Sequence, residues 1–146
     1  MASINPYLGF DYQCGPAFDF YKSVFGGEFA MKMKFNETPK DAQAPGQDSA
    51  EEGEKIMHVA LPIGKGTVLM GSDRPKAYGP GTMGDAFNVS IAAESKVEAD
   101  KLFNGLSAGG KVTVPLADTF WGAYFGMFTD KFGVQWMVNF DKNTSK

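Results

Sequence analysis

One order of elements, a strand, a helix and then three strands, is predicted twice along this chain of 146 residues. Each predicted helix ends at a glycine pair, Gly26-Gly27 and Gly109-Gly110, at the same offset (109 − 26 = 83). Asn5 and Asn88 begin the first strand of each half at that offset too (88 − 5 = 83). Such a repeat is the signature of a duplicated supersecondary unit. We therefore expect a single domain, residues 1–146, built from two related halves.

The first half, residues 1–73, alternates apolar and polar residues in four segments, which is typical of half-buried strands. The elements predicted are strands over 4–12, 28–35, 55–63 and 67–72 and a helix over 16–25. Residues 36–53 are polar, acidic and rich in Pro, Ala and Gly, which predicts a mobile loop. Two interpretations of this loop stay open, a solvated surface insert or a lid over a pocket.

The second half, residues 85–142, follows a segment rich in Pro and Gly over 73–84 that is predicted to join the halves. Its elements are predicted as strands over 86–92, 111–116, 123–129 and 134–140 and a helix over 95–106. Ser95 and Glu98 have the spacing of a capping box at the start of that helix. Val97, Leu102, Phe103 and Leu106 form the predicted apolar stripe of the helix.

These elements predict an α+β fold of tandem βαβββ repeats, forming a curved mixed sheet around a cavity. In each half the helix is expected to cover one sheet face, while the other face lines the cavity. The strongly apolar strand positions should pack under the helices: Leu8, Phe10, Val59, Leu61, Leu69, Val89, Ile91, Val134, Trp136 and Val138. The mixed positions should line the cavity and bind a ligand: Asn5, Tyr7, His58, Met70, Ser72, Asn88, Ser90, Gln135 and Met137.

Composition and charge exclude several classes of function. The formal net charge of −3 disfavours nucleic acid as a partner. No apolar run reaches the roughly 18 residues that a membrane span needs, and the first residues lack the features of a signal peptide. The single Cys14, expected to be a buried small residue, cannot form an internal disulfide. We therefore expect a cytoplasmic protein that binds neither nucleic acid nor a membrane.

Several stretches resemble the PhnB-like branch of the vicinal-oxygen-chelate superfamily, which includes glyoxalases, bleomycin-resistance proteins and extradiol dioxygenases. The matching stretches are residues 5–8, 17–21, 24–28, 56–58, 69–73 and, longest and most specific, 118–139. The resemblance implies the paired βαβββ fold, a bacterial cytosolic setting and frequent dimerisation. A homodimer is expected also because exposed sheet edges must be covered. The resemblance does not imply a reaction.

The resemblance also implies where a metal would bind. Enzymes of the superfamily hold one divalent ion with ligands, mostly His and Glu, from the first and last strand of each half. The repeat locates these positions at Asn5, Met70, Asn88 and Met137. Amide oxygens are weak neutral ligands, and thioethers are soft ones that select Cu(I). We therefore expect no metal and no other cofactor.

His58 is the only histidine in the chain and the candidate catalytic residue. It is either a hydrogen-bonded pocket residue without chemistry or a general acid or base. The strand alternation predicts that it lies near Ser72 or Met70. Four carboxylates could join it, namely Asp11, Asp73, Asp118 and Asp130, although Asp130 has the sequence context of an ordinary turn residue.

Trp121 and its neighbour Phe120 could stack on a flat ligand, or they could close the cavity rim or a dimer contact. Together these features favour a protein that binds a small, partly aromatic or apolar molecule without the usual metal. The alternatives are a metal-dependent lyase or dioxygenase with a non-standard site around His58, and a metal-free acid/base enzyme that uses His58.

Overall fold

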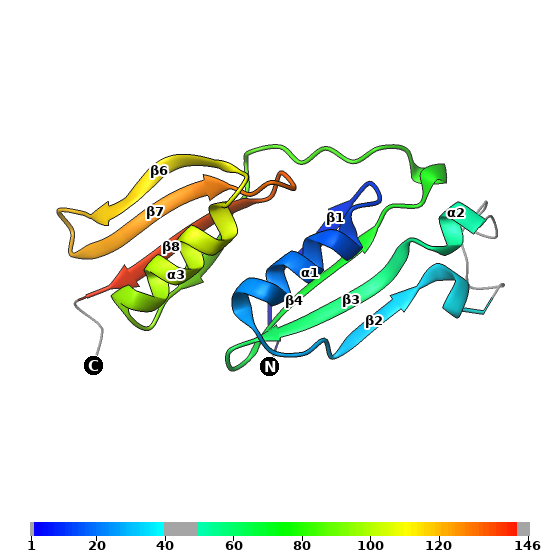
Figure 1. The fold of residues 1–146 in the computed structure, drawn as a ribbon, viewed down its shortest axis with the longest axis horizontal. Coiled ribbons are helices and arrows are strands. Elements are labelled where there is room, and N and C mark those ends of the chain that lie inside the picture. Colours follow the sequence, from blue (N-terminus) through cyan, green and yellow to red (C-terminus); the bar gives the residue numbers. More distant parts are fainter. Residues whose placement is uncertain (1, 40–49, 143–146) are drawn as a thin grey trace. The chain divides into compact units, whose positions relative to one another are not determined.

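The computed structural model describes residues 2–39 and 50–142, and the chain divides into two compact units, Met1–Thr82 and Met83–Lys146 (Figure 1). The division falls within the Pro- and Gly-rich segment 73–84. Among the described residues, no helix has both the length and the apolar character needed to cross a membrane. Each unit is described separately below.

Unit 1 is a four-stranded mixed sheet with a helix on one face (Figure 1). Its strand order is β1-β4-β3-β2, with β1 and β4 parallel and the other neighbours antiparallel. Its main elements are β1 (Tyr7–Phe10), α1 (Cys14–Phe25), β2 (Met31–Lys34), β3 (Ile56–Ile63) and β4 (Thr67–Asp73).

The core of unit 1 lies between α1 and the sheet. Helical spacing brings the buried Ala17, Phe18 and Tyr21 onto one side of α1. They pack against alternate strand residues that are also buried, Phe10, Val59, Leu61 and Leu69. Gly71 on β4 has no room for a side chain, since an added Cβ would lie 2.7 Å from the ring of Phe18. Phe18 therefore packs directly on the backbone of β4.

The start of α1 differs from the prediction. The helix begins at Cys14 rather than at Pro16, and Gln13 provides no side-chain cap. Instead, the buried carboxylate of Asp73 accepts hydrogen bonds from the Cys14 and Tyr12 N–H groups, at 2.9 and 3.1 Å. A cap that comes from a distant strand leaves no local sequence signal.

The predicted loop over 36–53 is wrong at both of its ends. A 3-10 turn, η1 (Phe35–Glu37), and a short helix, α2 (Ala50–Gly53), lie there. The Glu37 carboxylate accepts from the Lys34 N–H at 2.7 Å and closes the turn. Glu52 is buried and forms an ion pair with Lys55, 2.8 Å apart, which fixes α2. Residues 40–49 lie outside the described residues.

Unit 2 repeats this topology with strand order β5-β8-β7-β6, in which only β5 and β8 are parallel. Its elements are β5 (Val89–Ala92), α3 (Lys96–Ser107), β6 (Lys111–Asp118), β7 (Ala123–Thr129) and β8 (Gln135–Asp141). A short 3-10 turn, η3 (Lys76–Tyr78), follows β4 and belongs to unit 1. The predicted α+β class and the tandem βαβββ order are confirmed.

The core of unit 2 places α3 on β7 and β8. Leu102, Phe103 and Leu106 are buried against Phe128, Trp136 and Val138. The predicted cap of α3 is confirmed, since Ser95 Oγ accepts from the Glu98 N–H at 3.0 Å. Val97 was expected on the buried stripe but is 79% exposed, and Ala99 is buried instead.

Candidate functional site

The helix-free face of unit 1 is the sheet face opposite α1, and it carries Tyr7, His58, Met70 and Ser72. The alternation of strand residues decides this, because Leu69, Gly71 and Val59 point toward α1 and their neighbours point away. Tyr7 is the register partner of Met70, and Met70 in turn pairs with Ala60. Val59 pairs with Gly71, so His58 lies one step along from that pair, beside Ser72.

A hydrogen bond joins two of these residues. The Tyr7 hydroxyl lies 3.1 Å from Nδ1 of His58, and the two ring centroids are 5.6 Å apart. Tyr7 lies on β1 and His58 on β3, so the tyrosine side chain reaches across β4. The sequence predicted only the neighbours of His58 on β4, because a contact that skips a strand depends on side-chain length rather than on spacing.

The Tyr7 contact gives the imidazole two distinct nitrogen atoms. If the hydroxyl donates to Nδ1, the neutral ring carries its proton on Nε2, which is then a donor. In the other tautomer Nδ1–H donates to the hydroxyl oxygen, and Nε2 is a free acceptor. Nε2 can therefore meet a ligand as a donor or as an acceptor.

Asn5 lies outside β1, and its side chain is engaged with the backbone. Its Oδ1 accepts a hydrogen bond from the Val68 N–H at 3.0 Å. In unit 2, Asn88 directly precedes β5, and the register partner of Met137 is Ser90. The residues beside the two methionines are thus Tyr7 and Ser90, and each asparagine lies two positions earlier.

The donor set on these faces does not fit a hard divalent cation. Among the described residues of unit 1 it consists of one imidazole, a phenol, a hydroxyl and the thioethers of Met31, Met33 and Met70, with no carboxylate. Neutral oxygen and thioether ligands give a dication no compensating charge. Within residues 2–39 and 50–142, no group of three or more His, Cys, Asp or Glu side chains could hold a metal ion.

The helix-free face of unit 2 carries thioether and aromatic groups. Met137 pairs with Met127 on β7, and Gln135 pairs with Thr129. The Gln135 side chain donates to the Gly84 carbonyl at 3.4 Å. Ser90 completes the row beside Met137 on β5.

Trp121 lies in the turn between β6 and β7. It packs edge-on with Phe120, 5.0 Å between centroids, and its ring lies 6.3 Å from Phe125. Phe125 is two positions before Met127 on β7 and so shares its face. Phe120 is 98% exposed. The Trp121 ring therefore extends the helix-free face of unit 2.

The four candidate carboxylates have partners other than His58. Asp11 accepts from the Gly81 N–H, and Asp73 accepts from Tyr12, Cys14 and Ile56. A hydrogen bond from Lys142 holds the pKa of the Asp118 carboxyl below its usual range.

Asp130, expected as an ordinary turn residue, is buried and accepts from the Trp136 indole at 2.8 Å. Its other oxygen accepts from two N–H groups of the turn, those of Phe132 and Val134. Cys14 is buried as expected, and burial raises the pKa of its thiol far above the usual range, which makes it a poor nucleophile.

Comparisons with known proteins extend over nearly the whole chain. Residues 4–138 match the family model of the Glyoxalase/Bleomycin resistance protein/Dioxygenase superfamily. Protein YjdN of Escherichia coli is 32% identical over 93% of this chain and 93% of its own length.

Two solved structures share the fold. Protein PA1353 from Pseudomonas aeruginosa is 41% identical with a TM-score of 0.83, covering 97% of this chain and 98% of that one. A PhnB protein from Bacillus cereus is 23% identical with a TM-score of 0.72, covering 95% and 99%.

Proposed function

Since the chain belongs to the Glyoxalase/Bleomycin resistance protein/Dioxygenase superfamily, as its sequence indicated, we propose that it binds a small organic molecule without a catalytic divalent metal. The binding surfaces are the helix-free faces of its two units. The observation that carries the proposal is the hydrogen-bonded pair of Tyr7 and His58 in unit 1. It offers a polar contact beside the thioether of Met70, on the side of the sheet away from the core.

The chemistry of these faces favours a partly aromatic ligand with one hydrogen-bonding group. Nε2 of His58 would meet the polar group, and Met70 would contact the apolar part, since thioethers adapt to aromatic surfaces. In unit 2, Trp121 and Phe125 provide rings for stacking. On the face of unit 1, a flat molecule with a phenol or carbonyl group matches the contacts of His58 and Met70.

Calorimetric titration with 2-naphthol, a flat aromatic phenol, tests this proposal. We expect saturable binding that weakens about tenfold in His58→Ala and about threefold in Tyr7→Phe, because each loses a hydrogen-bonding group. Tyr78→Phe is the matched control, since Tyr78 is an exposed tyrosine of η3. Equal affinities in all four proteins would refute the proposal.

A second candidate function is metal-free acid/base catalysis at His58. The contact that favours it is again the Tyr7 hydrogen bond at Nδ1, because it holds the ring and leaves Nε2 for a substrate proton. In this case His58→Gln would abolish turnover of a substrate while ligand binding persists. Loss of binding together with turnover would favour the binding function.

The metal-dependent alternative is tested by elemental analysis after incubation with zinc, nickel, manganese or ferrous iron and desalting. Among the described residues, no group of three or more His, Cys, Asp and Glu side chains could hold a metal ion, which predicts near-zero stoichiometry. About one ion per chain would show that the protein binds metal through a different ligand set.

We also propose that the protein forms a homodimer. The edge strand β6 is almost wholly exposed and carries the exposed Val112 and Val114. Exposed apolar edges invite pairing with another chain. Sedimentation equilibrium should give twice the chain mass, and a mass of one chain would refute the dimer.

A further inference from the structure

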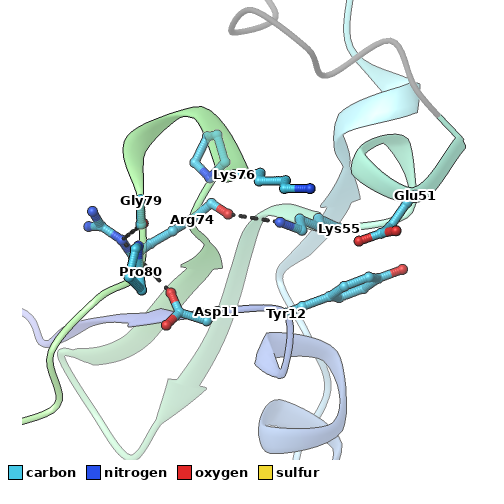
Figure 2. A pocket seen from close by; sticks show the side chains of 9 residues that line it. Asp11, Tyr12, Glu51, Lys55, Arg74, Lys76, Gly79 and Pro80 are labelled. Atoms are coloured by element: carbon cyan, nitrogen blue, oxygen red, sulfur yellow. Dashed lines mark hydrogen bonds and ion pairs between the residues drawn. The ribbon is translucent and has the colours of Figure 1, made fainter.

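Unit 1 contains a pocket of about 280 Å³ that the Tyr7–His58 face does not include. It lies where β1 and β4 end and β3 begins (Figure 2). Its lining residues come from three separate stretches of the chain, 11–12, 51–55 and 74–80. We call it the Lys55 pocket.

Lys55 is an unusual wall residue because its side chain is only 7% exposed. Its Nζ lies 2.8 Å from Glu52 Oε2 and donates to the Arg74 carbonyl oxygen at 3.2 Å. An ammonium group has three donors. These two contacts leave one N–H of Lys55 for a molecule in the pocket.

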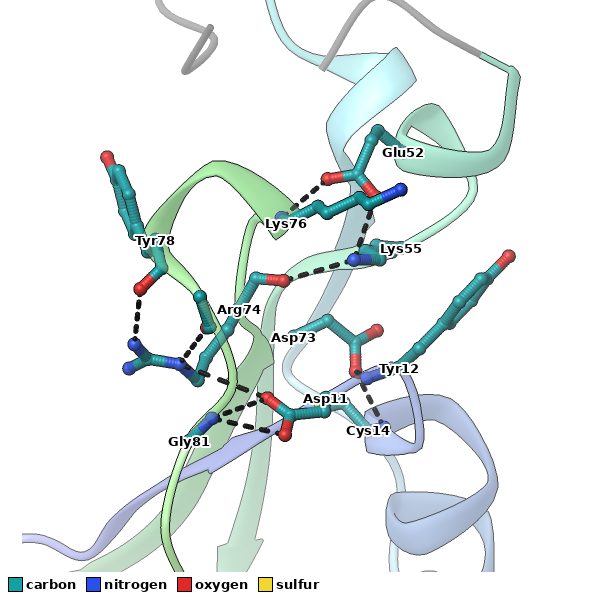
Figure 3. A network of polar contacts seen from close by, with 11 residues as sticks. Asp11, Tyr12, Cys14, Glu52, Lys55, Asp73, Arg74, Lys76, Tyr78 and Gly81 are labelled. Carbon is teal, nitrogen blue, oxygen red and sulfur yellow. Dashed lines mark hydrogen bonds and ion pairs between the residues drawn. The ribbon is translucent and has the colours of Figure 1, made fainter. Parts of the chain in front are cut away.

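The side chains of Arg74 and Asp11 form one wall of the pocket and are fixed by hydrogen bonds to backbone groups (Figure 3). Arg74 donates to the carbonyl oxygens of Gly79 and Tyr78, each at 3.1 Å. Both carboxylate oxygens of Asp11 accept from the Gly81 N–H, at 2.9 and 3.1 Å. These bonds fix the segment after β4 in place.

The ring of Tyr12 forms an aromatic wall of the pocket, and its backbone has an energetically unfavourable conformation. Its φ is +95°, and among the described residues it is the only non-glycine residue with a positive φ. A bulky residue rarely adopts this conformation, and such strain tends to occur at functional sites. The Asp73 carboxylate holds the Tyr12 N–H, and the Lys55 ammonium lies 5.5 Å from the centre of its ring.

Nearby carboxylates offset two of the three cations that line the pocket. Lys55 is paired with Glu52, and Arg74 lies 3.9 Å from Asp11. The Lys76 side chain is exposed at the rim, and its backbone N–H donates to Glu52. Lys76 is the remaining cation of the lining, so a monoanion matches it, whereas a dianion would meet repulsion from Glu51 and Glu52.

We propose that the Lys55 pocket binds a small aromatic monocarboxylate. The carboxylate accepts from the third N–H of Lys55 and from the Lys76 ammonium, which are charge-assisted hydrogen bonds. The aromatic body lies against the Tyr12 ring. This site is independent of the helix-free faces and of the function proposed for them.

Titration of the full chain with benzoate, followed by amide NMR shifts at low ionic strength, tests the proposal. We expect saturable shifts at Tyr12, Lys55 and Lys76. Lys76→Gln should weaken binding about three- to tenfold through the lost charge. Tyr12→Gly should weaken it by a similar factor of about three to ten through the lost ring contact, while it relieves the backbone strain.

Lys65→Gln is the matched control, because Lys65 is exposed in the turn between β3 and β4. It should leave benzoate affinity unchanged. Loss of affinity in this control equal to that in Lys76→Gln would overturn the proposal, as would the absence of saturable shifts in the unmodified protein. Inorganic phosphate binding as tightly as benzoate, without dependence on Tyr12, would overturn the aromatic carboxylate assignment. Shifts confined to Tyr7 and His58 would place benzoate on the helix-free face and equally refute it.

Discussion

The two units share one topology but stabilise the start of their helices in different ways. In unit 2, α3 is capped by Ser95, the residue directly before it. In unit 1, α1 is capped by Asp73, which lies at the far end of β4. The same carboxylate also accepts from the Ile56 N–H at 2.8 Å, so it joins α1, β3 and β4. The repeat therefore preserves the fold, while the start of α1, unlike that of α3, depends on a buried carboxylate from a distant strand.

Replacing that charge should have the largest effect on stability. Asp73→Ala would leave three backbone N–H groups without their acceptor and should lower the free energy of unfolding by about 3 kcal/mol or more. Urea unfolding followed by circular dichroism measures this change. The exposed Asp85→Ala serves as control, and a loss under about 1 kcal/mol for Asp73→Ala would contradict the assigned role.

The helix–sheet contact is where the units should behave alike. An added Cβ at Gly126 would lie 2.6 Å from the Phe103 ring, as one at Gly71 would meet Phe18. Each change to alanine should cost about 2 kcal/mol of stability, because the core must shift. Gly9 has open space around it, so Gly9→Ala should be nearly neutral in the same unfolding assay. A tolerated alanine at either glycine would break the equivalence of the two packing sites.

The local cap of α3 should matter less than the distant cap of α1. Ser95→Ala removes one acceptor from a helix end that water can reach, so a loss of about 1 kcal/mol is expected. The midpoint of thermal unfolding would report it, with the exposed Ser3→Ala as reference. If Ser95→Ala cost as much as Asp73→Ala, the contrast between the two helix starts would be lost.

Local sequence patterns predicted most helices and strands, but they could not predict contacts between residues that are distant in the sequence. The capping box of Ser95 and Glu98 predicts the start of α3 from four consecutive residues. The alternation of apolar and polar residues predicts which strand positions face the helices. The start of α1 depends on Asp73, which is 59 residues from Cys14 along the chain. The helix α2 depends on the local Glu52–Lys55 pair and also on the distant Lys76 N–H, which donates to Glu52.

The candidate site was likewise predicted only as far as local patterns allow. Alternation correctly grouped His58 with Met70 and Ser72 on one face, but the reach of Tyr7 across β4 needed three-dimensional register. The Lys55 pocket is lined by residues from three stretches of the chain, and its strained Tyr12 has no sequence signature.

We propose that the helix-free face of unit 1 binds an organic molecule through His58. Because His58 is the only histidine, its ring nitrogens give a single set of NMR signals that can be followed while 2-naphthol is added. We predict a saturable shift of the Nε2 signal at the same probe concentration that saturates calorimetric binding. Unchanged His58 ring signals at saturating 2-naphthol would show that His58 does not contact the ligand.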